Sequence, residues 1–213
     1  MMKFRLSSVL LFFAIILFGC SSTPPSQPKA SEAAQPAVKP PTLYTAKQCF
    51  DSMLGLAQRW QADAMPFHVE SEWNTEATGQ EGKATVWRAF FASPSRRTMK
   101  TLTCSGSRLL GSPAAGFTDS PEAPYSPDVP SLIFQPFAFV VDSDKAYAVT
   151  LDHGGKALIE KDPNQAIVYS LDWDRKTKQL TWAVYYGKNA APDVRKGLCV
   201  VDAKTGAFIA AGK

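Results

Sequence analysis

The stretch Trp87-Arg88-Ala89-Phe90-Phe91 (WRAFF) is followed 95 residues later by Trp182-Ala183-Val184-Tyr185-Tyr186 (WAVYY). Successive side chains of an extended strand point to opposite faces, so each tryptophan shares a face with the third and fifth residues of its stretch. Phe90 and Tyr185 occupy the same position in the two stretches and belong to the other face. The pair predicts two equivalent antiparallel strands, each with its tryptophan turned toward a covering helix.

The flanking residues extend this pattern into two similar units. In the first unit, the capping-box signature of Thr45 and Gln48 predicts a helix over 45–63, followed by strands at 67–74, 84–93 and 98–105. In the second, a helix should start at 142–144 and stop or break at Gly154-Gly155, before strands at 167–174, 180–186, 198–202 and 207–211. We therefore expect an α+β fold of duplicated helix-plus-antiparallel-sheet units, with each helix across one sheet face.

The alignment of the two units sets which side chains should be buried. It places Trp73 on Trp173, Lys100 on Lys196 and Leu102 on Leu198. Phe67 is expected to face inward with Trp73, and Leu198 to be buried like Leu102. The units span residues 43–107 and 137–213. The connector between them, residues 108–136, contains six prolines from Ser112 onward, so we expect no regular structure in it.

Two motifs of the second unit suggest a family. Its helix opens on Asp142-Ser143-Asp144-Lys145-Ala146, and its last strands enclose Val201-Asp202-Ala203-Lys204-Thr205-Gly206, a turn in which Gly206 supplies a positive φ. Over residues 138–213 these motifs resemble the early helix and closing turn of PepSY and PepSY-like domains of bacterial exported proteins. The first unit has Cys104-Ser105-Gly106-Ser107 in place of that turn. The resemblance implies a cystatin-like fold and a non-catalytic role, either as an inhibitory propeptide segment or as a free-standing envelope protein.

The amino-terminal residues are typical of an exported protein. Residues 1–19 have basic Lys3 and Arg5 before an apolar run, which is shorter than the roughly 20 residues that span a bilayer and reads as a signal peptide. Leu17-Phe18-Gly19-Cys20 resembles the bacterial lipobox, which implies that acyl chains on Cys20 anchor the mature chain to a membrane. Ser21 after the cysteine implies delivery to the outer membrane, facing the periplasm. The Pro-rich residues 20–42 read as a disordered tether.

Net charge bears on the class of partner, and the cysteine positions bear on disulfide pairing. The net charge of +4 falls to +2 without residues 1–19, too little to suggest a nucleic-acid partner. In an exported protein, the remaining cysteines are expected to form one disulfide and leave one thiol. Cys49 lies on the apolar helix face and Cys104 shares strand parity with Leu102, whereas Cys199 has the parity opposite to Leu198. We therefore predict a Cys49–Cys104 disulfide and a buried free thiol at Cys199.

Residues suited to catalysis or metal binding are few. His68 beside Glu70 could form an acid–base pair, but a surface strand residue is the simpler reading, and His153 suits a helix end. Asp142, Asp144 and Asp152 lack the glycine and distal glutamate of an EF-hand loop. We expect no metal, no cofactor and no enzyme, but a binding or inhibitory module. A structural part of an envelope complex and a small hydrolase remain as alternatives.

The aromatic pair is the candidate binding feature. Phe90 and Tyr185 should point away from the covering helices, so something else must cover them. Either the two units pack sheet to sheet around them, which we favour here, or the face is open and binds an envelope protein through aromatic contacts.

Overall fold

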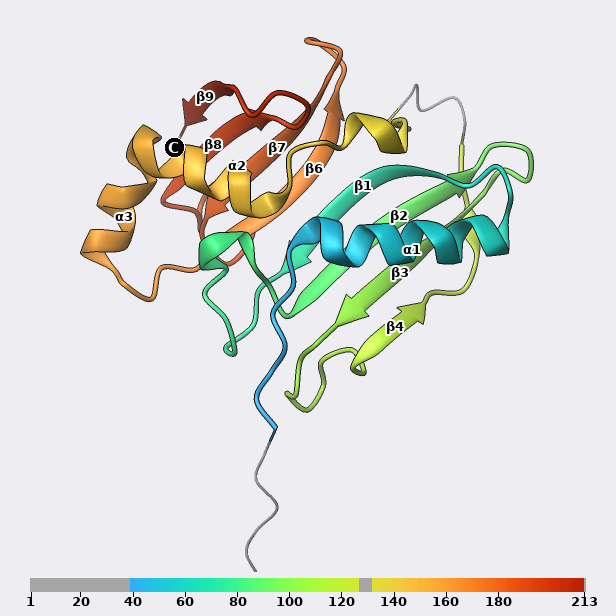
Figure 1. Cartoon of the computed structure of the whole chain (residues 1–213), viewed down its shortest axis with the longest axis horizontal. Coiled ribbons are helices and arrows are strands. Elements are labelled where there is room, and N and C mark those ends of the chain that lie inside the picture. Colours follow the sequence, from blue (N-terminus) through green and yellow to red (C-terminus); the bar gives the residue numbers. More distant parts are fainter. Residues whose placement is uncertain (1–38, 127–131, 213) are drawn as a thin grey trace, which may run out of the picture. The chain divides into compact units, whose positions relative to one another are not determined.

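A computed structural model describes residues 39–126, the first half, and residues 132–212, the second half (Figure 1). The predicted signal peptide, Cys20 and nearly all of the tether lie outside the described residues. Val38–Lys213 form one compact unit with its own core, which is what an independently folding domain requires. No helix in the described part is both long and apolar enough to cross a membrane.

The first half begins with a helix and continues with antiparallel strands. The capping box predicted at Thr45 and Gln48 is present at the start of α1. The strand predicted at 98–105 has these bounds in the structure, and the other elements differ by a few residues. The elements are α1 (Ala46–Trp60), β1 (Met65–Glu72), the 3₁₀ turn η1 (Gln80–Gly82), β2 (Val86–Ser93), β3 (Thr98–Ser105), β4 (Gly116–Asp119) and β5 (Ala123–Pro124).

The second half follows the same order of helix and strands. Gly154 has φ of 102° and interrupts the helix as predicted, but a single wide turn bridges the break and the helix resumes as α3. The elements are η2 (Pro136–Ala138), α2 (Ser143–Thr150), the wide turn η3 (Leu151–Gly155), α3 (Lys156–Lys161), β6 (Val168–Asp174), β7 (Gln179–Tyr186), β8 (Gly197–Asp202) and β9 (Phe208–Gly212).

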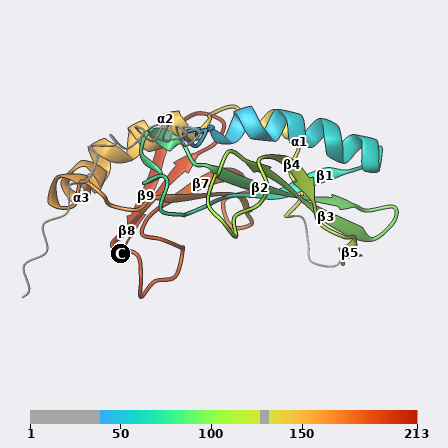
Figure 2. The ribbon, with the colours of Figure 1, turned by 90° about the horizontal axis from the view of Figure 1, so that it is seen from below.

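All strands belong to one antiparallel sheet of order β4-β3-β2-β1-β6-β7-β8-β9, with β5 also on β3. The halves join where β1 pairs with β6, at His68 opposite Asp172, Val69 opposite Leu171 and Glu70 opposite Ser170. Helices α1 and α2 lie on the same face of this sheet (Figure 2). The expected sheet-to-sheet packing is therefore wrong: the halves meet edge to edge, which pairs two strand edges that would otherwise be left open.

One core extends beneath both helices. Trp87 of β2 and Trp182 of β7 are fully buried, and their ring centroids lie 6.3 Å apart. Tyr169 of β6 contacts both indoles, and Phe139, which precedes α2, contacts Trp182 and also Phe50 of α1. The predicted inward direction of both tryptophans is confirmed.

Each tryptophan also holds the start of a helix. The indole N–H of Trp87 donates to the carbonyl oxygen of Tyr44 at 2.8 Å, and that of Trp182 donates to the carbonyl oxygen of Val141 at 2.8 Å. Tyr44 and Val141 each stand immediately before the N-cap of their helix. The same bond therefore places α1 and α2 over the sheet.

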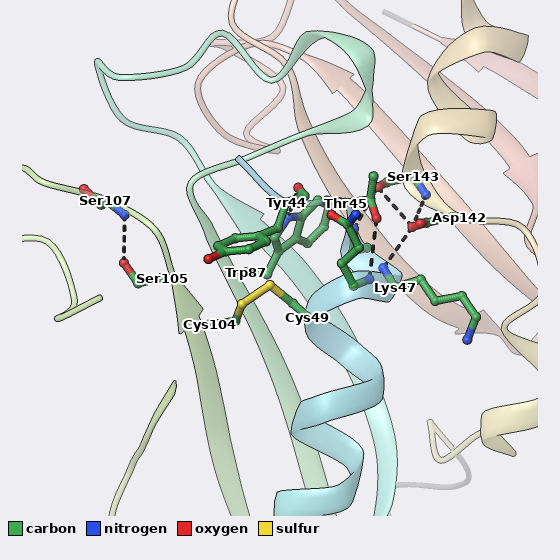
Figure 3. Close-up of a disulfide and its surroundings, with 12 residues drawn as sticks. Tyr44, Thr45, Lys47, Cys49, Trp87, Cys104, Ser105, Ser107, Asp142 and Ser143 are labelled. Carbon is green, nitrogen blue, oxygen red and sulfur yellow. Dashed lines mark hydrogen bonds between the residues drawn. A yellow bond between two sulfur atoms is a disulfide. The ribbon is translucent and has the colours of Figure 1, made fainter. Parts of the chain in front are cut away.

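The starts of the two helices are also bonded to each other (Figure 3). In the first turn of α1, the backbone N–H of Ala46 donates to Ser143 Oγ and that of Lys47 donates to Asp142 Oδ1, both at 2.9 Å. Ser143 Oγ in turn donates to the carbonyl oxygen of Gly82 at 2.6 Å. Because Asp142 is also the N-cap of α2, one carboxylate serves both helices.

The Cys49–Cys104 disulfide is confirmed, with Cα atoms 5.8 Å apart (Figure 3). Cys199 is a buried free cysteine, as predicted. The predicted orientation of β8 is nevertheless wrong by one residue. Cys199 is 3% exposed and faces the core, whereas Leu198, which was expected to be buried, is only half-buried. The register shows why, because Ala89 opposes Leu102 while the matching Val184 opposes Cys199.

Two further expectations are corrected by the structure. The connector is not devoid of regular structure, since β4 and β5 both pair with the outer edge of β3. Phe67 does not face the core, because β1 has an irregularity between Pro66 and His68 that turns it toward Phe90 on the opposite face. A bulge of this kind inserts one residue and shifts the alternation of faces.

Candidate binding surface on the open sheet face

The sheet face opposite α1 and α2 is called the open face here. Strand alternation and register assign side chains from β1, β2, β6 and β7 to it. They include both aromatic residues singled out from the sequence, which are half-buried. The open-face residues used below are His68, Glu70, Glu72, Arg88, Phe90, Asp172 and Tyr185.

Phe90 belongs to an aromatic group in the first half. Its ring centroid lies 5.9 Å from that of Phe67 and 5.1 Å from that of His68. Tyr125, just beyond β5, lies 5.6 Å from Phe67, and burial raises the pKa of its hydroxyl. The bulge in β1 assembles this group, because without it Phe67 would point toward α1.

Tyr185 lines a groove of about 210 Å³ in the second half. The loop between β7 and β8 contributes Lys188, whose Nζ lies 4.4 Å from the ring centroid of Trp73. Other walls of the groove include Glu72 and Arg88, which form an ion pair across β1 and β2. The groove thus combines two aromatic rings with side chains of both charges, a lining suited to a polar or zwitterionic segment.

Phe90 and Tyr185 share a face but do not meet. Phe90 lies opposite His68, His68 opposite Asp172, and Asp172 opposite Thr181. Tyr185 is four residues further along β7, so the two positions are separated by three interstrand spacings and four residues, about 20 Å. The predicted pair is therefore two separate sites on one surface.

His68 lies where the two halves join. Its Nδ1 is 2.6 Å from Asp172 Oδ1, and its Nε2 is 3.2 Å from Glu70 Oε2. Burial disfavours the charged ring, but the hydrogen bonds and negative charges of Asp172 and Glu70 outweigh this and raise the pKa of His68 to about 9. At neutral pH the imidazolium therefore donates to both carboxylates and links β1 to β6.

The other candidates from the sequence lie elsewhere. His153 is in the wide turn after α2, where its ring stacks on Phe208 with centroids 3.6 Å apart. Asp142 is the N-cap of α2, and Asp152 lies in the wide turn. Within residues 39–126 and 132–212, no group of three or more His, Cys, Asp or Glu side chains is placed to hold a metal ion.

Sequence reasoning missed the residues that shape the Tyr185 groove. Glu70 and Glu72 share a parity that signals an outward-facing charged row. No periodic pattern signals that Lys188 would reach Trp73 from a hairpin loop, because that contact depends on how the loop folds back.

Comparisons with known proteins give a likeness of fold. No protein-family model and no curated protein matches the sequence. The crystal structure of a protein from Clostridium difficile 630, described as a "putative lipoprotein", is similar with a TM-score of 0.51 and 9% identity, over 76% of this chain and 91% of that chain. At this identity the likeness concerns the fold alone.

Proposed function

We propose that this protein is a lipid-anchored envelope protein whose folded part is a non-catalytic binding module. The lipobox-like residues Leu17 to Cys20 support the anchor, and the "putative lipoprotein" of similar fold is consistent with it. Two or more acyl chains on Cys20 would give stable membrane attachment. Ser21 favours the outer membrane, with the module facing the periplasm.

We also propose that the module is a tandem of PepSY-like units. Support comes from the shared order of one helix and three antiparallel strands in each half. It also comes from Trp87 and Trp182, which make the same bond to the residue before a helix. Matching bonds at matching positions are what a duplicated unit would retain.

The observation that carries the binding proposal is the half-buried aromatic pair on the face opposite the helices. Phe90 and Tyr185 lie about 20 Å apart on the same face of the sheet. Aromatic side chains are enriched in the cores of protein interfaces, and a partner contacting both would span an interface of ordinary size. We propose that this partner is another envelope protein, which the module holds or inhibits.

A small hydrolase would need a general base, and His68 is the residue to consider. A base that works near neutral pH should have a pKa close to 7. The pKa of His68 is raised to about 9, and both ring nitrogens are engaged by carboxylates. This environment favours a fixed positive charge, which supports the non-catalytic proposal over the hydrolase.

The binding proposal is tested by placing a photo-crosslinking amino acid at Phe90, at Tyr185 and, as a control, at exposed Ser52 on α1. In the native host, both open-face positions should yield the same adduct, and Ser52 should not. Adducts at Ser52 alone, or unrelated adducts at the two open-face positions, would contradict the proposal.

The anchor is tested separately with Cys20→Ser. The variant should accumulate as uncleaved precursor and lose metabolic labelling with palmitate. A variant that still matures and still takes up the label would exclude Cys20 as the anchor, without affecting the proposal for the open face.

A further inference from the structure

A second hollow lies on the helix side of the sheet, in the second half. It is a groove of about 530 Å³ between the segment before α2 and the ends of β6 and β7. Phe134 and Phe137 line one wall, and Trp173 and Leu180 line the other. This volume lies within the range of small-molecule sites, which are mostly apolar with a few placed polar groups.

One end of this groove is basic. Lys178 of the β6–β7 turn and Lys204 of the β8–β9 turn both line it, and Arg175 and Lys176 flank it in the first of these turns. Within the described part of the chain, none of these four side chains forms an ion pair.

The groove also contains one carboxylate, that of Asp202, which offsets one of the two lysine charges. Asp202 Oδ1 accepts from the backbone N–H groups of Lys204 at 2.8 Å and Thr205 at 2.7 Å. Burial opposes the charged form of Asp202, but these hydrogen bonds prevail and lower its pKa. Asp202 therefore keeps its negative charge while it holds the turn, and the positive charge of Lys204 contributes to lowering its pKa. With Lys178 and Lys204 against this one carboxylate, the groove lining retains a net positive charge.

Two cations of the first half, Arg96 and Lys100, are placed differently. Arg96 pairs with Glu122, and Lys100 pairs with Asp119, so acidic side chains already balance that region. By contrast, Lys178 and Lys204 form no ion pair within the described residues, and both line an apolar groove.

We propose that this groove binds a single-chain fatty acid, with its hydrocarbon chain against Phe134, Trp173 and Leu180 and its carboxylate at Lys178 and Lys204. An apolar trough that ends in cations is complementary to an anionic amphiphile. Phe137, 81% exposed at the mouth, would cover the bound chain. A flat bilayer could reach exposed Phe137, whereas a groove of about 530 Å³ suits a single separate chain.

The test uses oxidised residues 38–213 and oleate, below its aggregation concentration, in isothermal titration calorimetry. Saturable one-to-one binding is expected. Lys178→Gln/Lys204→Gln should weaken it about tenfold, since two exposed charge contacts are lost. Lys156→Gln/Lys161→Gln on α3 removes the same charge from exposed positions outside the groove and should leave the affinity unchanged.

Further probes separate the remaining explanations. Oleyl alcohol, which lacks the carboxylate, should bind more weakly than oleate and should respond little to Lys178→Gln/Lys204→Gln. Vesicles of phosphatidylglycerol should not sediment the protein. The proposal is overturned if oleate does not saturate, if the α3 control weakens binding equally, or if vesicles bind while oleate does not.

Discussion

The first half fastens its helix to the sheet with a covalent bond, and the second half does so with hydroxyl groups and close packing. In the first, Cys49 of α1 is joined to Cys104 of β3. In the second, Thr150 at the end of α2 lies 2.6 Å from the hydroxyl of Tyr186 on β7, within hydrogen-bond distance. That hydroxyl also fills the space beside Gly155, where an added Cβ would lie 1.8 Å from it.

The two halves should therefore be destabilised by different changes. The same arrangement of helix on sheet depends on an oxidising compartment in one half and on side-chain size in the other. Since the halves share one sheet and one core, damage to either should still be felt by the whole domain.

The largest expected effect is loss of the disulfide. Cys49→Ala/Cys104→Ala should lower the free energy of unfolding by roughly 4 kcal/mol, the chain-entropy value for a loop of this length. Denaturant titration with and without dithiothreitol measures this, and the reductant should destabilise the wild type but not the double variant. Cys199→Ala is the control and should keep the sensitivity to reductant. A double variant as stable as the wild type would contradict the role of the bond.

A smaller loss of unfolding free energy is expected from a substitution at Gly82, where the two halves are in contact. This residue has φ of 68°, and an added Cβ would lie 2.3 Å from the backbone nitrogen of Asp144. Gly82→Ala should cost about 3 kcal/mol, because backbone strain and a backbone clash add. Gly154→Ala is the matched control: φ is 102° but the space is open, so only the strain remains. Equal losses in thermal unfolding would show that the contact between the halves is unimportant.

The bond across the joint should respond to pH. Folding raises the pKa of His68 from 6.5 to about 9, so its stabilisation is fully present below pH 6.5 and is lost as the pH rises through 9. The loss should be about 2 kcal/mol, less than full linkage implies because the side chain is partly exposed. Unfolding free energies between pH 6 and 10 measure it. In His68→Gln this decline should disappear; an unchanged decline would assign it to another group.

The hydrogen bond between Thr150 and Tyr186 should contribute less to the free energy of unfolding. Tyr186→Phe should cost about 1 kcal/mol, the typical net value of a buried hydrogen bond, since Thr150 still donates to the carbonyl oxygen of Tyr147. The loss should be the same with and without dithiothreitol. A double-mutant cycle with Thr150→Val checks the coupling, and additive losses would mean that the two hydroxyls do not interact.

The smallest effect on stability is expected on the open face. Tyr185→Lys should change the free energy of unfolding by less than about 0.5 kcal/mol, as is usual for surface substitutions, and should abolish the crosslink formed through Phe90. Val184→Lys changes the neighbouring, fully buried residue and should prevent folding. This contrast would confirm that Val184 and Tyr185 point to opposite faces of β7. A large loss in Tyr185→Lys would mean that this face is covered.

Local sequence patterns predicted the helices and strands better than they predicted which strands pair with each other. Thr45 with Gln48 fixed the start of α1, and the direction of each tryptophan followed from alternation. The pairing of β1 with β6 could not be predicted, because periodicity sets which face is buried but not which edges meet. On β8, Leu198 and Cys199 are both apolar, so hydrophobicity did not distinguish their faces.

For the candidate site, too, the sequence predicted which face a side chain occupies but not which side chains lie near it. Phe90 and Tyr185 were placed on the correct face, but their separation depends on the register of three successive strand pairs. Phe67 joined Phe90 only through a bulge, and Lys188 reached Trp73 only through a loop. Neither leaves a periodic signal in the sequence.

The shared helix start bears on whether the halves are autonomous. In the first turn of α1, Ala46 and Lys47 obtain their hydrogen-bond acceptors from Ser143 and Asp142. A fragment ending before the second half would leave those amide groups without these acceptors and would expose the edge of β1. Fragments divided between the halves should therefore complement each other as an obligate pair rather than persist as separate domains, which makes the two halves a single cooperative unit.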